Sequence, residues 1–138
     1  MIKFKLLNEH AKEPKRATNG SAGFDLYATD NYTIWPGAHV KIPTGVSCSF
    51  PSTHGGFIWP RSGLATKYGF DLLAGLDDSD YRGEIHVCGI NHGDRKIEIM
   101  RGDRIAQLVV SPVETDAELV DYLDDTERGS GSFGSTGF

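Results

Sequence analysis

Short runs that alternate apolar with polar residues constrain the fold of this chain more than any other feature. The alternation runs through Val46–Phe50, Glu84–Cys88 and Lys96–Met100, and it is typical of strands with one buried face. Five further short runs also have the composition of strands: 3–7, 32–35, 40–42, 56–59 and 104–110. The 17 glycines and 6 prolines supply many turns between them. Short strands separated by frequent turns predict a β-sandwich or barrel.

Only one segment has the composition of a helix. Residues Ser62–Tyr68 are expected to form a short helix that ends at Gly69, a residue that closes helices well. The alternation of strands and helices that builds a parallel sheet is missing. We therefore predict an all-β fold with at most one short helix.

The chain is expected to consist of one β domain over residues 1–127 and a mobile arm over residues 128–138. A length of 138 residues fits a single domain, and the arm is rich in Gly and Ser, which favours flexibility. A simple spacer does not need Arg128 and Phe133 at fixed places. Gly-rich backbone with hydroxyl groups and a cation is also suited to wrapping phosphates.

The charge and the hydropathy pattern exclude several classes of partner. The formal net charge of -5 argues against general binding to nucleic acid or to an anionic membrane surface. No apolar run approaches the roughly 20 residues that span a bilayer, and the N-terminus has no signal-peptide pattern. We expect a cytoplasmic protein.

Asp25 stands in the apolar run Ala22–Ala28, directly after a Gly-Phe pair. A buried carboxylate needs a partner, such as a cation or a metal-bound water, because leaving it unpaired is costly. A turn-capping aspartate is the alternative, and the run by itself favours that alternative.

Arg61 and Ser62 follow a predicted strand and open the predicted helix. Free backbone N–H groups, a hydroxyl and a bidentate guanidinium at that place suit a phosphate. The alternative is a Ser62 that caps the helix beside a solvated Arg61. The segment leaves both interpretations open.

Three aspartates cluster in Gly75–Ile85, namely Asp77, Asp78 and Asp80. Such a cluster is usually a solvated loop, and the spacing does not match a calcium-binding EF-hand loop. One carboxylate can instead act as a general base toward water, with Tyr81 packed flat against a sugar. Further along the chain, Arg104 and Gln107 enter the last predicted strand.

Taken in chain order, the segments around Asp25, Arg61, Asp78 and Gln107 and the C-terminal arm resemble the five motifs of the trimeric dUTPase family. The segments PRSGLA, DYRGE, GDRIAQL and RGSGSFGSTG are close to the family pattern, and the match spans residues 22–137. The resemblance implies a jelly-roll-like distorted β-barrel subunit, a homotrimer whose active sites draw on all three chains, and Mg²⁺ as cofactor. The implied activity is hydrolysis of dUTP to dUMP and pyrophosphate. That reaction keeps uracil out of DNA and supplies dUMP for dTMP synthesis.

The resemblance also implies roles for individual residues. Asp78 matches the catalytic base, and Asp25 matches an aspartate that holds Mg²⁺ through a water. The implied substrate-binding residues are Arg61, Ser62, Gly63, Gly75, Leu76, Tyr81, Gln107, Arg128, Phe133, Gly134, Ser135 and Thr136. The second and fourth motifs contact the phosphates, the hairpin from Gly75 to Tyr81 receives uracil and deoxyribose, and the arm grips the γ-phosphate while Phe133 stacks on uracil.

Two positions depart from the family pattern. Asp77 replaces the usual aliphatic residue before the catalytic aspartate, and it also raises the question of which carboxylate is the base. Alternation along an extended segment predicts that Asp77 faces away from the pocket, so we interpret Asp78 as the base and Asp77 as dispensable. Ser132 replaces a glycine in the arm, at a cost of about 1 kcal/mol if that position needs positive φ.

Three rival interpretations follow from the same sequence. A dCTP deaminase shares the fold but does not match Asp78 and Tyr81. A binding protein on the dUTPase scaffold would not need intact motifs, although the sequence does not decide whether a regulatory partner is bound as well. A structural subunit would not need Arg128 or Phe133 in the arm.

Overall fold

The computed structural model describes residues 1–137 and contains eleven strands and one helix. In chain order the elements are β1 (Lys3–Leu6), β2 (Phe24–Tyr27), β3 (Tyr32–Ile34), β4 (His39–Pro43), β5 (Val46–Ser49), β6 (His54–Pro60), α1 (Ser62–Tyr68), β7 (Phe70–Leu72), β8 (Leu76–Asp77), β9 (His86–Asn91), β10 (Ile97–Ile99) and β11 (Arg104–Pro112). The predicted all-β fold with one short helix is confirmed.

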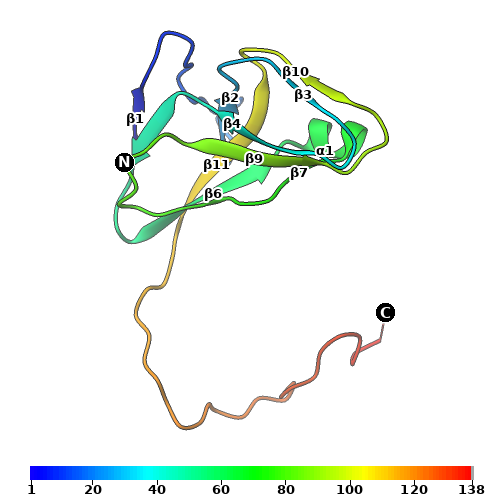
Figure 1. The fold of residues 1–138 in the computed structure, drawn as a ribbon. Coiled ribbons are helices and arrows are strands. Elements are labelled where there is room, and N and C mark those ends of the chain that lie inside the picture. The colour runs from blue at the N-terminus through cyan, green and yellow to red at the C-terminus, as the bar shows by residue number, and fades with distance from the viewer. Residues whose placement is uncertain (138) are drawn as a thin grey trace.

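The strands pair in antiparallel fashion throughout. A four-stranded sheet has the order β2-β11-β6-β8, and a three-stranded sheet has the order β4-β9-β7. Two smaller pairs, β1 with β5 and β3 with β10, complete the fold. Among residues 1–137 no sheet closes on itself as a complete barrel. Figure 1 shows α1 at one end of the molecule and the C-terminal segment leaving its body.

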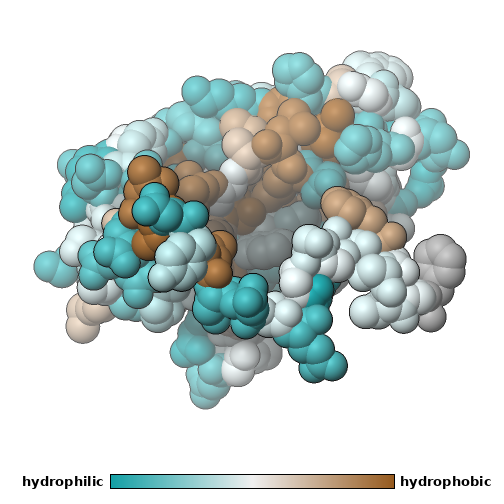
Figure 2. Space-filling model, turned by 90° about the horizontal axis from the view of Figure 1, so that it is seen from below, coloured by the Kyte–Doolittle hydropathy of each residue, from teal (hydrophilic) through white to brown (hydrophobic). Residues whose placement is uncertain are grey.

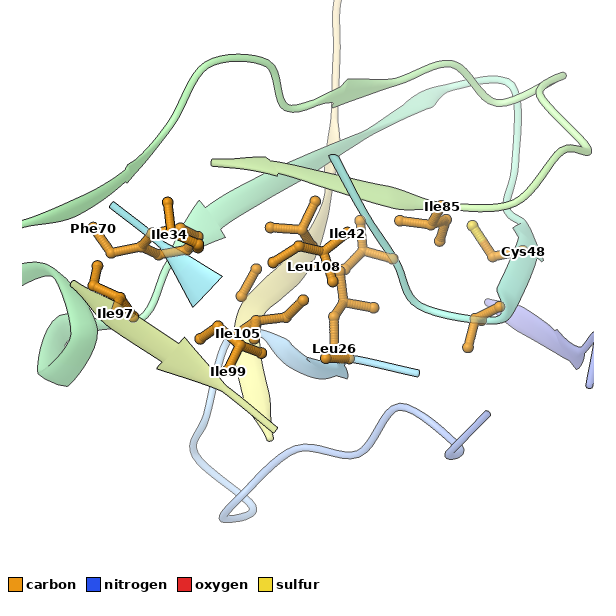
Figure 3. Packing of buried hydrophobic residues seen from close by; sticks show 14 of the residues in the cluster. Leu26, Ile34, Ile42, Cys48, Phe70, Ile85, Ile97, Ile99, Ile105 and Leu108 are labelled. Carbon is orange, nitrogen blue, oxygen red and sulfur yellow. The ribbon is translucent and has the colours of Figure 1, made fainter. Parts of the chain in front are cut away.

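The core lies between the sheets and is built mainly from aliphatic side chains. Figure 3 shows these side chains converging from strands that are distant in the sequence. The largest fully buried hydrophobic side chains are Phe70, Leu26, Ile34, Ile42, Ile85, Ile99, Ile105, Leu108, Val46 and Val87. Each contributes about 1.5–3 kcal/mol relative to exposure to water, so this cluster holds the sheets together.

The predicted helix is confirmed with the bounds that the sequence indicates. It ends because Gly69 adopts φ 71°, a left-handed conformation that glycine tolerates well. The Gly69 N–H donates a 2.9 Å hydrogen bond to the Ala65 carbonyl oxygen. This cap turns the chain directly into β7.

The eight predicted strands are all present, with shifts at their ends. Three short strands were not predicted: β2, β7 and β8. The alternation in Val46–Ser49 was misleading, because Ser47 is buried as well as Val46 and Cys48. β5 therefore has no solvent-facing side over its first three residues.

No strand or helix follows β11 within the described part of the chain. Residues 114–130 are exposed throughout, and the hydrogen bonds of residues 126–137 are local turns. One example is the 2.8 Å bond that Arg128 Nε donates to the Gly131 carbonyl oxygen. No helix of residues 1–137 has both the length and the hydropathy to cross a membrane.

We predict that Gly89→Ala strongly destabilises the fold. A Cβ at Gly89 would lie 2.2 Å from Cζ of Phe70, whose side chain is fully buried in the core. Overpacking of this kind typically costs about 1–3 kcal/mol. The measurement is urea unfolding of the variant beside Gly20→Ala, since a Cβ at Gly20 meets no atom within 4 Å. Equal stability of the two variants would contradict this account of the core.

Candidate active site

Asp25 lies in the middle of β2, with only 8% of its surface exposed. Its Oδ1 is 3.6 Å from Arg61 Nε, and its Oδ2 is 3.5 Å from Arg104 Nη1. Asp25 is therefore not a turn cap. Two guanidinium groups compensate its buried charge, as a carboxylate in this environment requires.

Register in the four-stranded sheet brings Gln107 to the same place. Gln107 on β11 lies opposite Asp25 on β2 and opposite Trp59 on β6. Its Nε2 donates a 3.1 Å hydrogen bond to the Pro60 carbonyl oxygen, directly before Arg61. Gly23 makes room for this side chain, because a Cβ there would lie 2.6 Å from Gln107 Oε1.

The start of α1 presents Ser62 and Gly63 to solvent. Arg61 occupies the N-cap position in an extended conformation, and no side chain caps the helix. The interpretation of Ser62 as the cap is therefore wrong. Within the helix, the Thr66 hydroxyl donates a 2.7 Å hydrogen bond to the Ser62 carbonyl oxygen, one turn earlier.

A cavity of about 540 Å³ opens between α1, β10 and the start of β11. Its charged lining residues are Arg61, Lys67, Lys96, Glu98, Asp103 and Arg104. Lys96 Nζ already pairs with Glu98 at 3.0 Å. Arg61 and Arg104 already pair with Asp25, so with that carboxylate included the four cations exceed the acids by one.

The expected hairpin, Gly75 to Tyr81, consists of β8 and the turn that follows it; within residues 1–137 no strand pairs back onto β8 from that turn, so a two-stranded hairpin is not formed there. β8 pairs with β6, and the Ile58 N–H donates a 2.7 Å bond to the Gly75 carbonyl oxygen. A residue with a side chain does not fit at position 75 without a shift of the backbone, because its Cβ would lie 2.7 Å from the Ile58 carbonyl oxygen. The Tyr81 hydroxyl donates a 3.0 Å bond across the turn to the Glu84 carbonyl oxygen.

Asp77 and Asp78 line the same pocket of about 280 Å³ at this hairpin, together with Leu76 and Tyr81. The prediction that Asp77 faces away from the pocket is therefore wrong. Asp78 is exposed and Asp77 is half-buried, so the two carboxylates differ in environment. Burial raises the pKa of the Asp77 carboxyl above its ordinary value, and the neighbouring charge of Asp78 raises it further. Asp78 is the more accessible of the two carboxylates.

The predicted site residues fall into three separate groups on the single chain. Asp25, Arg61 and Gln107 form the first, and the hairpin with Asp78 and Tyr81 forms the second. The arm forms the third, since its cavity is lined only by residues between Thr126 and Thr136. Phe133 in the arm is fully exposed, with φ 51°.

Sequence reasoning missed the part that Arg104 plays as the second partner of Asp25. The only signal was its place three residues before Gln107, and the contact itself depends on an irregular pairing of β11 with β2 between Arg104 and Ala106. The burial of Asp77 was missed as well, because a two-residue strand has no detectable period.

Guanidinium groups, backbone N–H groups and a hydroxyl-bearing glycine-rich arm on an antiparallel β scaffold have the chemistry that suits phosphate anions. The model of the dUTPase family matches residues 9–137. The chain therefore belongs to the dUTPase family.

Named relatives match nearly the whole chain. The deoxyuridine 5'-triphosphate nucleotidohydrolase of Mus musculus is 46% identical over 137 residues, covering 99% of this chain and 85% of the relative. The same enzyme of Corynebacterium glutamicum is 48% identical, covering 99% of this chain and 94% of the relative. Among solved structures, a dUTPase mutant of Staphylococcus bacteriophage 80alpha with dUpNHpp superimposes with a TM-score of 0.92 at 28% identity, covering 100% of this chain and 99% of that one.

We predict that Asp77→Asn raises the melting temperature at pH 8 and has a smaller effect at pH 4. Because the folded-state pKa of Asp77 is raised above its ordinary value, the wild-type protein loses stability as pH rises from that ordinary value through the folded value. Above that pH range Asp77 is ionised in the folded protein, and its buried charge lowers the free energy of unfolding by the full amount. Scanning calorimetry from pH 4 to pH 8 measures the difference. Asp80→Asn, which changes an exposed carboxylate, serves as control, and an identical trend in both variants would refute the assignment.

Proposed function

We propose that this chain is a dUTP diphosphatase that hydrolyses dUTP to dUMP and pyrophosphate. The match of the dUTPase family model to residues 9–137 carries the proposal. Relatives with 42% to 48% identity over nearly the whole chain are named deoxyuridine 5'-triphosphate nucleotidohydrolase. The separate groups of anion-binding and acidic residues supply the chemistry that this reaction needs.

Asp78 is proposed as the general base. Its carboxylate is exposed at the hairpin pocket, where it can take a proton from a water that attacks the α-phosphorus. The bond from the α-phosphorus to the bridging oxygen then breaks, and pyrophosphate leaves. Positioning and charge neutralisation dominate phosphoryl transfer, so a single base is enough on the protein side.

The hairpin is proposed to select the base and the sugar. Backbone groups of Gly75 and Leu76 suit the donor and acceptor pattern of uracil, and a hydrogen-bonding pocket rejects a mismatched base strongly. The Tyr81 ring, held by its bond to the Glu84 carbonyl oxygen, packs under deoxyribose and leaves no room for a 2′-hydroxyl.

The phosphates are proposed to bind at the start of α1 and under the arm. Arg61, Ser62, Gly63 and Gln107 are close together around the Pro60 carbonyl. The arm residues proposed to close over the γ-phosphate and uracil are Arg128, Phe133, Gly134, Ser135 and Thr136. A guanidinium group binds phosphate oxygens in bidentate fashion, which favours Arg61 and Arg128 for this role.

Mg²⁺ is proposed as the cofactor. The Asp25 carboxylate is occupied by Arg61 and Arg104, so it fits a contact through a metal-bound water better than direct coordination. Mg²⁺ commonly keeps several waters and binds through substrate phosphates. When bound, the ion would neutralise charge on the triphosphate.

A homotrimer with shared sites is proposed as the assembly. The three groups of site residues lie apart on one chain, so partner copies would have to bring them together. The surface also carries apolar area: Trp59, Leu73 and Leu76 are each more than half exposed along a groove of about 380 Å³. Figure 2 shows apolar surface on the face seen from below. Exposed patches of this kind mark interaction sites.

We predict that Asp78→Asn lowers kcat by roughly 10²–10⁴-fold, the usual contribution of a general base. The KM for dUTP is expected to change little, because the substituted amide keeps the shape of the side chain. Asp80→Asn is the matched control, since Asp80 is an exposed carboxylate of the same hairpin. Near-normal turnover of the Asp78 variant would remove Asp78 from the mechanism.

We further predict Mg²⁺-dependent pyrophosphate release from dUTP alone. The assay compares dUTP, dTTP, dCTP and UTP, each with Mg²⁺ and with chelator, and also follows ammonia release from dCTP. Release from UTP would contradict the role of Tyr81. Ammonia from dCTP would favour the deaminase instead.

Mixed assemblies test the shared site directly. Asp78→Asn and a chain lacking residues 128–138 are each expected to be inactive. Because the two defects affect different parts of the site, trimers refolded from both chains are expected to regain part of the wild-type activity. A mixture as inactive as its components would show that each site belongs to one chain.

A further inference from the structure

The side chain of Asp77 is half-buried against β6, with one edge at the pocket that Asp78 also lines. Asp77 pairs with Gly56 on β6, and its Cβ lies 3.0 Å from the position that a Cβ on Gly56 would occupy. Leu108 and Phe50 side chains lie 3.3 Å from the same position. Asp77 therefore extends along the side of β6 that packs against the core.

One carboxylate oxygen of Asp77 has no partner. Its Oδ2 is the one buried side-chain polar atom of residues 1–137 that forms no hydrogen bond. Asp25, the more deeply buried carboxylate of this sheet, has two arginines as partners. A buried carboxylate without such compensation is costly when ionised and far less costly when protonated.

The charged groups around Asp77 do not remove this cost. Asp78 follows it on the same segment. The pocket that both line also contains Lys41 of β4, His86 at the start of β9, and Glu84 just before β9. From β5 comes the Cys48 thiol, whose pKa is raised to about 11 by burial and then by the charge of Asp77, while Arg82 lowers it. Across from Asp77, β6 contributes Gly56, and Leu108 of β11 lies close to the same place. Glu84 is also engaged elsewhere, since its Oε1 accepts a 2.7 Å bond from the Gly45 N–H.

β8 is the weakest attachment in the four-stranded sheet. It has two residues and two registered pairs with β6, Gly56 with Asp77 and Phe57 with Leu76. The hairpin that it starts carries Gly75, Leu76, Asp78 and Tyr81. A change at Asp77 therefore acts where the proposed uracil and sugar pocket joins the rest of the protein.

We propose that Asp77 is a pH-responsive positioning residue: its neutral form keeps β8 against β6, and its ionised form loosens the hairpin, so the enzyme binds dUTP less tightly as pH rises. The proposal rests on the proposed role of this hairpin in binding dUTP. It assigns Asp77 no contact with substrate and no part in proton transfer. The expected effect is therefore on KM and not on kcat.

The test compares the pH profiles of KM and kcat for wild-type protein, Asp77→Asn and Asp80→Asn between pH 4 and pH 9. The full-length protein is used in all cases, with saturating Mg²⁺. For the wild type we expect KM to rise by about threefold or more over this range relative to the Asp77→Asn variant, with kcat profiles that coincide. Ionisation of dUTP itself affects every variant equally, so it cancels in the comparison. Asp80→Asn is expected to follow the wild type.

Hydrogen exchange gives a readout that does not depend on activity. The Ile58 N–H, which donates to the Gly75 carbonyl oxygen, reports on attachment of the hairpin. Its protection factor is expected to fall with rising pH in the wild-type protein and to stay constant in Asp77→Asn.

Parallel KM profiles for the wild type and Asp77→Asn, or a pH-independent protection factor in the wild type, would overturn the proposal. A uniform loss of activity at every pH in Asp77→Asn would overturn it too, because that result indicates a purely structural role. If the proposed function is wrong, neither the wild type nor any variant hydrolyses dUTP at any pH. The hydrogen-exchange experiment still tests the role of Asp77 in that case, because it does not depend on activity.

Discussion

The pairing of β11 with both β2 and β6 is the interaction on which the rest of the structure depends. β11 is the longest strand, and its buried residues Ile105, Ala106 and Leu108 join the core. The same pairing sets Gln107 opposite both Asp25 and Trp59. Because side chains alternate along a strand, the register that buries Leu108 also aims Gln107 toward the start of α1. Packing of the core and geometry of the proposed phosphate-binding residues therefore come from one set of backbone hydrogen bonds.

Two carboxylates in this sheet show opposite solutions to the cost of burial. Asp25 sits between Arg61 and Arg104, so its charge is compensated and the arginines are themselves held in place. Asp77 has a buried oxygen without a hydrogen-bond partner, and its pKa is raised as a result. Breaking the first arrangement would leave uncompensated charge. The second arrangement is already uncompensated, which makes it responsive to pH.

The groups that a nucleotide hydrolase needs at one site lie on different parts of this chain. A guanidinium-rich cavity, an acidic hairpin and a glycine-rich arm lie on different parts of the monomer, and the arm makes only local hydrogen bonds. Flexible Gly-rich backbone loses conformational entropy when it closes, so closure needs contacts that a bound triphosphate can supply. In the proposed trimer, such a division would let substrate binding complete the site and would link catalysis to assembly.

The sequence by itself determined the all-β class, the bounds of α1 and the approximate place of eight strands, because period-two alternation and a terminal Gly69 are local signals. It also identified the family, since five ordered motifs are read without coordinates. Only the tertiary structure decided the rest. β2, β7 and β8 were not predicted, and they are strands through their pairing with β11, β9 and β6; β8, with two residues, is too short to show a period at all. The ion pair of Arg104 with Asp25 depends on a register shift in the sheet, and the burial of Asp77 depends on Gly56 across from it. These features come from contacts between distant segments, which no local pattern encodes.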